Sequence, residues 1–231
     1  MQGDAGGVGW RRSGADEWAL SHGEAGVRKG ILGGTFNPPH IAHLIVAQEM
    51  RETLDLDHVV LVPTSVHAFK GPASADPRHR AAMTELAVAG DPGLAVDRIE
   101  IQRGGISYTV DTLRALRERE PETDWTLILG GDNLEELAEW REAHELPELA
   151  SVVVTTRAGL PAPERLPFGG RCTLVDVPSL EVSSTAIRER VARGRSIRYW
   201  VPPGVEAYIR GHDLYRQVAP AGSIDTAAPR G

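Results

Sequence analysis

Residues 31–43 read ILGGTFNPPHIAH, and this stretch decides the fold. An apolar run ends at the glycine pair Gly33–Gly34, a proline-rich turn follows, and a helical pattern opens at His40. The predicted order is therefore strand, glycine turn and helix start. Glycines let the backbone approach a phosphate, and a helix start offers unpaired N–H groups and the positive end of a dipole. The stretch therefore predicts an anion-binding site.

Two histidines stand at the start of that helix. His40 and His43 are three residues apart, so a helix places them on one face of its first turn. By itself such a pair is typical of an ordinary strand–helix turn with surface histidines. Beside a phosphate-binding turn, however, the two imidazoles predict hydrogen-bond donors that act on the bound phosphate.

The totals restrict what the chain can be. It has 231 residues, of which 41% are apolar, which suits one α/β domain or a domain with an appendage. A net charge of −7 argues against broad binding to nucleic acid. The single cysteine, Cys172, cannot form an internal disulfide, which favours a reduced, cytoplasmic setting. We expect no membrane partner, because no apolar run is long enough for a span and no signal peptide is visible.

Strands alternate with helices, which predicts an α/β fold with a doubly wound, mostly parallel sheet and a small C-terminal helical portion. We expect strands at 29–32, 58–62, 94–97, 99–102, 125–129, 151–156 and 172–177. We expect helices to begin at His40, at Pro77 behind Asp76, behind Ser107, at Ser183 or Ser184, and after Pro202–Pro203. Ligands of such a sheet lie beyond the carboxyl ends of its strands, where the glycine turns after Leu32 and Leu129 both fall.

The two ends of the chain lack such a pattern. Residues 1–26 are rich in glycine and charge and are predicted to be a disordered extension, and residues 217–231 a disordered tail. The folded domain is therefore expected to span residues 27–216. In the helix that begins at Pro77, the expected buried face consists of Met83, Leu86 and Ala87.

The glycine turn also resembles a known signature. Residues 33–43, GGTFNPPHIAH, are similar to the motif G-G-T-F-D-P-x-H-x-G-H of the nucleotidylyltransferase superfamily, and most similar to its bacterial nicotinate-nucleotide adenylyltransferases. Asn37 replaces the usual Asp, which is a mild change, and Ala42 replaces a Gly, so that a methyl group lies where the nucleotide binds. The resemblance implies a Rossmann-like fold whose ATP-binding residues include Gly33, Gly34, Thr35, Phe36, His40 and His43.

A second stretch resembles the superfamily's other signature, V/I-S-S-T-x-I-R. Residues 182–188 read VSSTAIR, and a helix capped by these serines places Arg188 on the side of Ser184 or Thr185. Alone, the pattern is typical of a capped helix with an exposed arginine. The resemblance implies that Ser183, Ser184, Thr185 and Arg188 hold the β- and γ-phosphates of ATP.

The loop after the second strand resembles the family's P-x-x-x-P-P-H-K. Residues 63–70 read PTSVHAFK, in which Lys70 aligns with the lysine that contacts phosphate. The resemblance implies that Lys70 acts in catalysis and contacts the acceptor nucleotide. His67, Ala68 and Phe69 do not match, so the family's loop histidine has no counterpart here.

Two further segments imply an acceptor site. SYTVDTL at 107–113 is similar to S-Y-T-x-x-T-L, and residues 131–141 are similar to G-x-D-x-L followed by tryptophan. Without the resemblance, these residues would be a helix cap and a half-buried core tryptophan. With it, Gly131 and Asp132 contact ATP, and the residues that hold nicotinate mononucleotide are Asn37, Lys70, Thr109, Asp132, Trp140 and Arg141. In this interpretation Trp140 stacks on the pyridine ring, Thr109 and the N–H of Arg141 hold its carboxylate, and Asp132 accepts from ribose.

The resemblance implies transfer of AMP from ATP to nicotinate mononucleotide, giving deamido-NAD (nicotinate adenine dinucleotide) and pyrophosphate in NAD biosynthesis. Mg²⁺ is expected to be bound mainly through the ATP phosphates rather than by a protein metal site. One alternative is a related transferase whose acceptor is nicotinamide mononucleotide, phosphopantetheine or FMN. Another is an inactive nucleotide-binding regulator, which Ala42 and the altered loop at 67–69 favour. The protonation of the histidines and assembly into a homo-oligomer are left open.

Overall fold

The structure, a computed structural model, describes residues 26–68, 73–134, 136–157 and 167–216. These residues form one six-stranded sheet in the order β4-β2-β1-β6-β7-β8, and every pairing in it is parallel. Its strands are β1 (Arg28–Gly34), β2 (His58–Pro63), β4 (Leu94–Val96), β6 (Asp124–Gly130), β7 (Ser151–Arg157) and β8 (Thr173–Val177). The chain builds outward from β1 through β2 and then outward on the other side through β6, so the switch point lies between β1 and β6.

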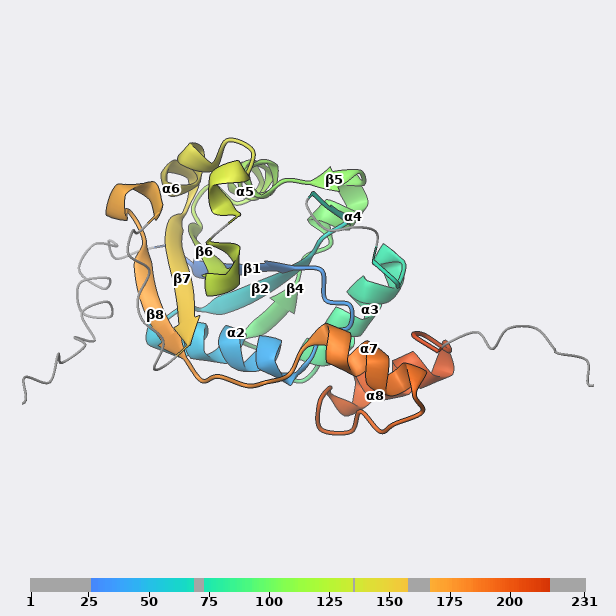
Figure 1. The fold of residues 1–231 in the computed structure, drawn as a ribbon. Coiled ribbons are helices and arrows are strands. Elements are labelled where there is room, and N and C mark those ends of the chain that lie inside the picture. The colour runs from blue at the N-terminus through green and yellow to red at the C-terminus, as the bar shows by residue number, and fades with distance from the viewer. Residues whose placement is uncertain (1–25, 69–72, 135, 158–166, 217–231) are drawn as a thin grey trace, which may run out of the picture.

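Helices cover both faces of the sheet (Figure 1). α2 (Ile41–Thr53) lies on one face, and α5 (Thr109–Arg119) and α6 (Leu146–Leu149) lie on the other. Successive residues of β1 point to opposite faces, so Leu32 packs in the cluster around Met50 of α2, and Ile31 packs in the cluster around Leu113 of α5. The apolar character of β1 on both faces follows from this double cover.

A third cluster joins the C-terminal helices to the domain. α3 (Pro77–Val88), α7 (Ser184–Ala192) and α8 (Pro203–Gly211) pack around Met83, Ile187 and Val205, each of which is fully buried. α4 (Ile99–Arg103) and a two-stranded parallel sheet of β3 (Val66–His67) and β5 (Ile106–Ser107) complete the described elements apart from short 3₁₀ helices. The predicted doubly wound fold with a C-terminal helical portion is confirmed.

Two predictions, one about secondary structure and one about burial, are wrong. Residues 99–102 form helix α4 rather than a strand, because the Asp97 carboxylate accepts from the Ile99 N–H at 2.9 Å and turns the chain as β4 ends. Leu86 is 37% exposed, whereas Met83 and Ala87 are buried, because Leu86 lies at the rim of α3 beside Gly204 of α8.

The predicted extensions fall outside the described residues, except for Gly26. The domain boundaries at 27 and 216 therefore stay predictions. No helix in the part of the chain that the structure describes is both long and apolar enough to cross a membrane.

Candidate active site

The two glycine turns lie side by side at the carboxyl edge of the sheet. β1 and β6 are neighbours, with Leu32 paired to Ile128, and each strand ends in a glycine. A side chain added at Gly33 would meet nothing within 4 Å, whereas one added at Gly34 would lie 3.0 Å from the Phe36 ring. Gly33 therefore faces open space, where a ligand can approach the backbone.

The loop between β1 and α2, residues 35–40, is called the motif loop, and it places both histidines at the start of α2. His40 is the N-cap residue and is 7% exposed, and its backbone N–H donates to Nδ1 of His43 at 3.1 Å. The two rings stack with centroids 3.7 Å apart, and the Phe36 ring meets His43 edge-on at 5.0 Å. Because Nδ1 of His43 accepts a hydrogen bond, the neutral ring carries its proton on Nε2, which is thus a donor.

Burial decides the charge of these imidazoles. It lowers the pKa of His40 to about 4, because the cationic form loses its hydration. Burial and, less strongly, the neighbouring His40 lower the pKa of His43 to about 3. Both rings are therefore neutral at pH 7, which answers the question that the sequence left open.

These lowered pKa values predict that stability falls in mild acid. A histidine in the unfolded chain has a pKa of 6.5, so below that pH the unfolded state binds protons that the folded state does not. We expect the melting temperature to fall as the pH decreases from about 6.5 to about 5, above the range where carboxylates titrate. Differential scanning fluorimetry should show a smaller fall for a His40→Gln/His43→Gln double variant. An equal fall in both proteins would contradict the assignment.

The second signature docks directly on the motif loop. Oγ of Ser184, the first residue of α7, donates to the Pro38 carbonyl at 2.7 Å. Nη1 of Arg188 donates to the Asn37 carbonyl at 2.8 Å, and its Nη2 donates to Oγ1 of Thr185 at 3.1 Å. Of the two predicted caps, Ser183 and Ser184, the N-cap residue is Ser183, whose Oγ accepts from the Ala186 N–H at 3.2 Å. Two segments about 150 residues apart thus meet beside the histidines.

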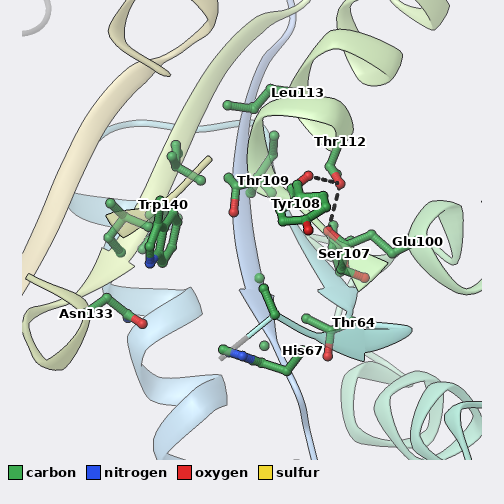
Figure 2. A pocket seen from close by; sticks show the side chains of 18 of the residues that line it. Thr64, His67, Glu100, Ser107, Tyr108, Thr109, Thr112, Leu113, Asn133 and Trp140 are labelled. Atoms are coloured by element: carbon green, nitrogen blue, oxygen red, sulfur yellow. Dashed lines mark hydrogen bonds between the residues drawn. The ribbon is translucent and has the colours of Figure 1, made fainter. Parts of the chain in front are cut away.

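A cavity of about 100 Å³ opens between β1, β6 and α5. Trp140 forms one wall, and Tyr108 and Thr109 form the opposite wall (Figure 2). Gly33 and Gly34 also line the cavity, so it adjoins the motif loop. An aromatic wall on one side and a helix start on the other would suit a flat ring that carries a negative group.

The helix start in this cavity differs from the prediction. We expected Ser107 to cap the helix, but the N-cap residue is Tyr108, whose side chain makes no capping bond. Oγ of Ser107 instead accepts from the Ser65 N–H at 2.9 Å, because Ser107 lies in β5 beside the loop after β2. In the described part of the chain, the N-cap side chain therefore leaves the first N–H groups of α5 uncapped, so that they can bind an anion.

The opposite wall also offers donors. Among the described residues, the indole N–H of Trp140 is buried without a hydrogen-bond partner, and no acceptor is found for the backbone N–H of Arg141. The guanidinium of Arg141 bonds to Asp111 at 3.2 Å and to Glu142 at 3.1 Å. These carboxylates hold the guanidinium of Arg141, which lies over the Tyr108 ring, 5.0 Å from its centroid.

Of the other predicted residues, Asp132, Phe36 and Asn37 do not line this cavity. Asp132 is exposed in a 3₁₀ helix, Gly131–Asn133, directly beyond β6. Phe36 is 2% exposed and belongs to the core, where its ring meets His43 edge-on. The amide of Asn37 donates to Ser74 and accepts from Tyr215, so it holds the motif loop. Lys70 lies outside the described residues.

Three residues at the site were missed from the sequence. Tyr215 donates its hydroxyl to Oδ1 of Asn37 at 2.9 Å. Glu100, which lines the cavity and is 6% exposed, accepts from Thr112 at 2.7 Å, and burial raises its pKa. Arg80 is 1% exposed beneath the motif loop. The only sequence signal for Arg80 and Glu100 was a charged residue inside a predicted element.

Comparisons with known proteins show the family of this chain. The cytidylyltransferase-like family matches residues 31–190. A probable nicotinate-nucleotide adenylyltransferase of Salinibacter ruber is 43% identical over 189 residues, covering 81% of this chain and 97% of that protein. One from Thermus thermophilus is 44% identical over 192 residues, covering 82% of this chain and 100% of that protein.

Solved structures share the fold. The nicotinic acid mononucleotide adenylyltransferase of Plasmodium falciparum, complexed with NaAD, aligns with a TM-score of 0.68 and 19% identity, covering 81% of this chain and 97% of that one. A putative nicotinate-nucleotide adenylyltransferase from Vibrio parahaemolyticus aligns with a TM-score of 0.60 and 23% identity, covering 82% of this chain and 96% of that one.

Proposed function

Because this chain belongs to the nicotinate-nucleotide adenylyltransferases, within the cytidylyltransferase-like family, we propose that it transfers AMP from ATP to nicotinate mononucleotide. A 5′-phosphate oxygen of the mononucleotide forms a bond to the α-phosphorus of ATP. The bond from that phosphorus to the bridging oxygen of the β-phosphate breaks in line, and pyrophosphate leaves. The products are deamido-NAD and pyrophosphate.

The residues act by position and charge rather than by proton transfer. The attacking phosphate is already an oxyanion, so no general base is needed. Nε2–H of the neutral His43 donates to the α-phosphate, where negative charge develops in the transition state. His40 lies stacked on His43, and its Nδ1 is buried with no partner among the described residues. Its role toward the bound phosphate comes from the family motif.

The start of α7 receives the leaving group. Arg188 lies one turn into the helix, and hydroxyls of Ser184 and Thr185 precede it. A guanidinium fork beside hydroxyls and helix N–H groups would bind the β- and γ-phosphates. Lys70, on the loop after β2, would add a flexible positive charge.

The cavity beside Gly33 receives the acceptor. The pyridine ring lies against Trp140, and its carboxylate accepts from the N–H groups at the start of α5 near Thr109 and from the N–H of Arg141. Asp132 accepts from ribose hydroxyls, and Asn37 shapes the motif loop between the two nucleotides. The assignments of Asn37 and Asp132 come from the family motif.

Mg²⁺ belongs to this proposal as a substrate-bound ion. When bound, it would offset the negative charge of the ATP phosphates. The described residues hold no group of three His, Cys, Asp or Glu side chains placed to ligate a metal. The open space at Gly33 is compatible with a metal that arrives on the phosphates of ATP. A cytoplasmic location, proposed from the single cysteine, would supply both nucleotides.

The observation that carries the proposal is the docking of α7 on the motif loop, next to a cavity that joins a tryptophan to an uncapped helix start. The test measures pyrophosphate release with ATP, Mg²⁺ and one acceptor at a time. We expect nicotinate mononucleotide to give a kcat/KM at least about tenfold above that of nicotinamide mononucleotide, since helix N–H groups favour a carboxylate.

A second test, with a Trp140 variant, asks whether the acceptor binds in the cavity. Trp140→Ala should raise KM for the mononucleotide by about tenfold and leave KM for ATP nearly unchanged.

In the acceptor assay, faster turnover with phosphopantetheine or FMN would replace the proposed acceptor. ATP binding without pyrophosphate release from any acceptor would instead favour an inactive regulator.

A further inference from the structure

Arg80 lies on α3, beneath the active site, and neither the family motifs nor the proposed mechanism gives it a role. Its side chain is among the largest that are fully buried in the protein, and the residue is 1% exposed. A fully buried arginine is unusual, because removing a guanidinium from water is costly unless its donors are satisfied. Its contacts therefore indicate what its position is used for.

The guanidinium donates to three backbone carbonyls from three separate loops. Nη1 donates to the Thr35 carbonyl at 2.8 Å, and Nη2 donates to the Ser65 carbonyl at 2.8 Å. Nε donates to the Ala75 carbonyl at 3.2 Å. The first loop carries the histidine motif, the second leads from β2 toward Lys70, and the third leads into α3. One side chain thus ties together the loops that surround the proposed phosphate site.

The partners of Arg80 are neutral, and this separates it from an ordinary buried ion pair. No carboxylate oxygen among the described residues lies within salt-bridge distance of its guanidinium. Asp76 and Glu100 act on it only through their more distant charges. A planar fork with fixed donor directions positions carbonyls more strictly than a flexible ammonium does.

Further hydrogen bonds connect these loops to each other and to the start of α5. The Thr64 N–H donates to the Gly34 carbonyl at 3.0 Å, so the first and second loops also touch each other. The Ser65 N–H donates to Ser107 at 2.9 Å, which links the second loop to the start of α5. Because a trans peptide holds its C=O and N–H in opposite directions, fixing the Thr35 carbonyl on Arg80 aims the Phe36 N–H away from it.

We propose that Arg80 is a positioning residue for the reaction: its guanidinium fixes the motif loop and the loop after β2 at the separation that in-line transfer requires. The inference rests on the proposed function. Loss of the fork would let the two loops move apart by a fraction of an ångström to an ångström, which is enough to impair an in-line reaction. It would affect turnover more than binding of the acceptor, whose ring lies against Trp140.

The test compares Arg80→Lys, which keeps the charge but loses the fork, with Arg78→Ala, an exposed arginine on the same helix. For Arg80→Lys we expect a folded protein, a kcat lowered by roughly 100-fold, and a KM for the mononucleotide changed by less than about threefold. Hydrogen exchange should become faster together in peptides covering residues 33–40 and 63–68. Arg78→Ala should match the wild type in all three measurements.

Chemical rescue supplies a readout that a purely structural role would not move. Guanidinium ion is added at tens of millimolar, a concentration that does not denature the protein. It should raise the kcat of Arg80→Gly by at least about tenfold and leave the kcat of the wild type unchanged. Near-normal kcat in Arg80→Lys, or an Arg80→Lys protein that does not fold, would overturn the proposal. If the wild type uses another acceptor, the proposed function is wrong, and the kcat and KM of Arg80→Lys relative to the wild type are then measured with that acceptor. Failure of the proposed function is thereby distinguished from failure of the role of Arg80.

Discussion

Replacing His43 with alanine is expected to lower kcat for AMP transfer by about 10²- to 10³-fold while the protein stays folded. Nδ1 of His43 is occupied by the backbone of His40, so Nε2–H is left as the donor toward the α-phosphate. Alanine removes that donor at the point where charge develops in the transition state. The expected loss corresponds to about 3–4 kcal/mol in the activation barrier. Pyrophosphate release at saturating ATP and mononucleotide measures it.

His58→Ala is the matched control for this variant. His58 lies at the amino end of β2, on the opposite edge of the sheet, where its Nδ1 is 3.2 Å from the Pro92 carbonyl. Its removal should leave kcat within about twofold of the wild type. Circular dichroism and melting temperature establish that both variants are folded. Near-normal turnover in folded His43→Ala would remove this histidine from the mechanism.

Arg188→Ala is expected to lower kcat/KM for ATP by about 10²-fold, through a lower kcat and a higher KM. The guanidinium has two tasks: it holds the Asn37 carbonyl of the motif loop at 2.8 Å, and it would offset the charge that accumulates on departing pyrophosphate. Arg188→Lys should recover part of the charge effect but not the forked geometry. Initial rates over a range of ATP concentrations separate the two parameters.

Arg193→Ala provides the control within the same segment. Arg193 follows α7 and is exposed, and its guanidinium lies 3.5 Å from Glu189. An exposed pair of this kind contributes little, so its loss should leave kcat/KM unchanged. Similar losses in Arg188→Ala and Arg193→Ala would show that the basic character of the segment matters rather than a specific phosphate contact.

Much of the fold could be predicted from the chain because its signals are local. Apolar runs ending in glycine define β1 and β6, and Asp76 before Pro77 sets the start of α3, where Asp76 accepts from the Arg78 N–H at 2.8 Å. Each of these depends on a few adjacent residues. The error at residues 99–102 has the same origin, since an apolar pair fits a strand or a short helix until its neighbours are placed.

The sequence predicted several residues of the candidate site but not how they contact one another. The motifs identified Trp140, Thr109 and the two signatures, and the structure places the first two on facing walls of one cavity (Figure 2). The sequence could not tell that Ser107 bonds to Ser65 rather than capping α5. Nor could it show that Tyr215 reaches Asn37 across 178 positions of the chain.

By itself the sequence determined the order of the six strands of the main sheet, the glycine turns and the family, because these depend on residue type and short spacing. Tertiary structure alone decided the neutral state of His40 and His43, the docking of Arg188 on the motif loop, and the carbonyl contacts of buried Arg80. The physical reason is that desolvation and long-range hydrogen bonds depend on which distant segments exclude water around a group. No short stretch of residues carries that information.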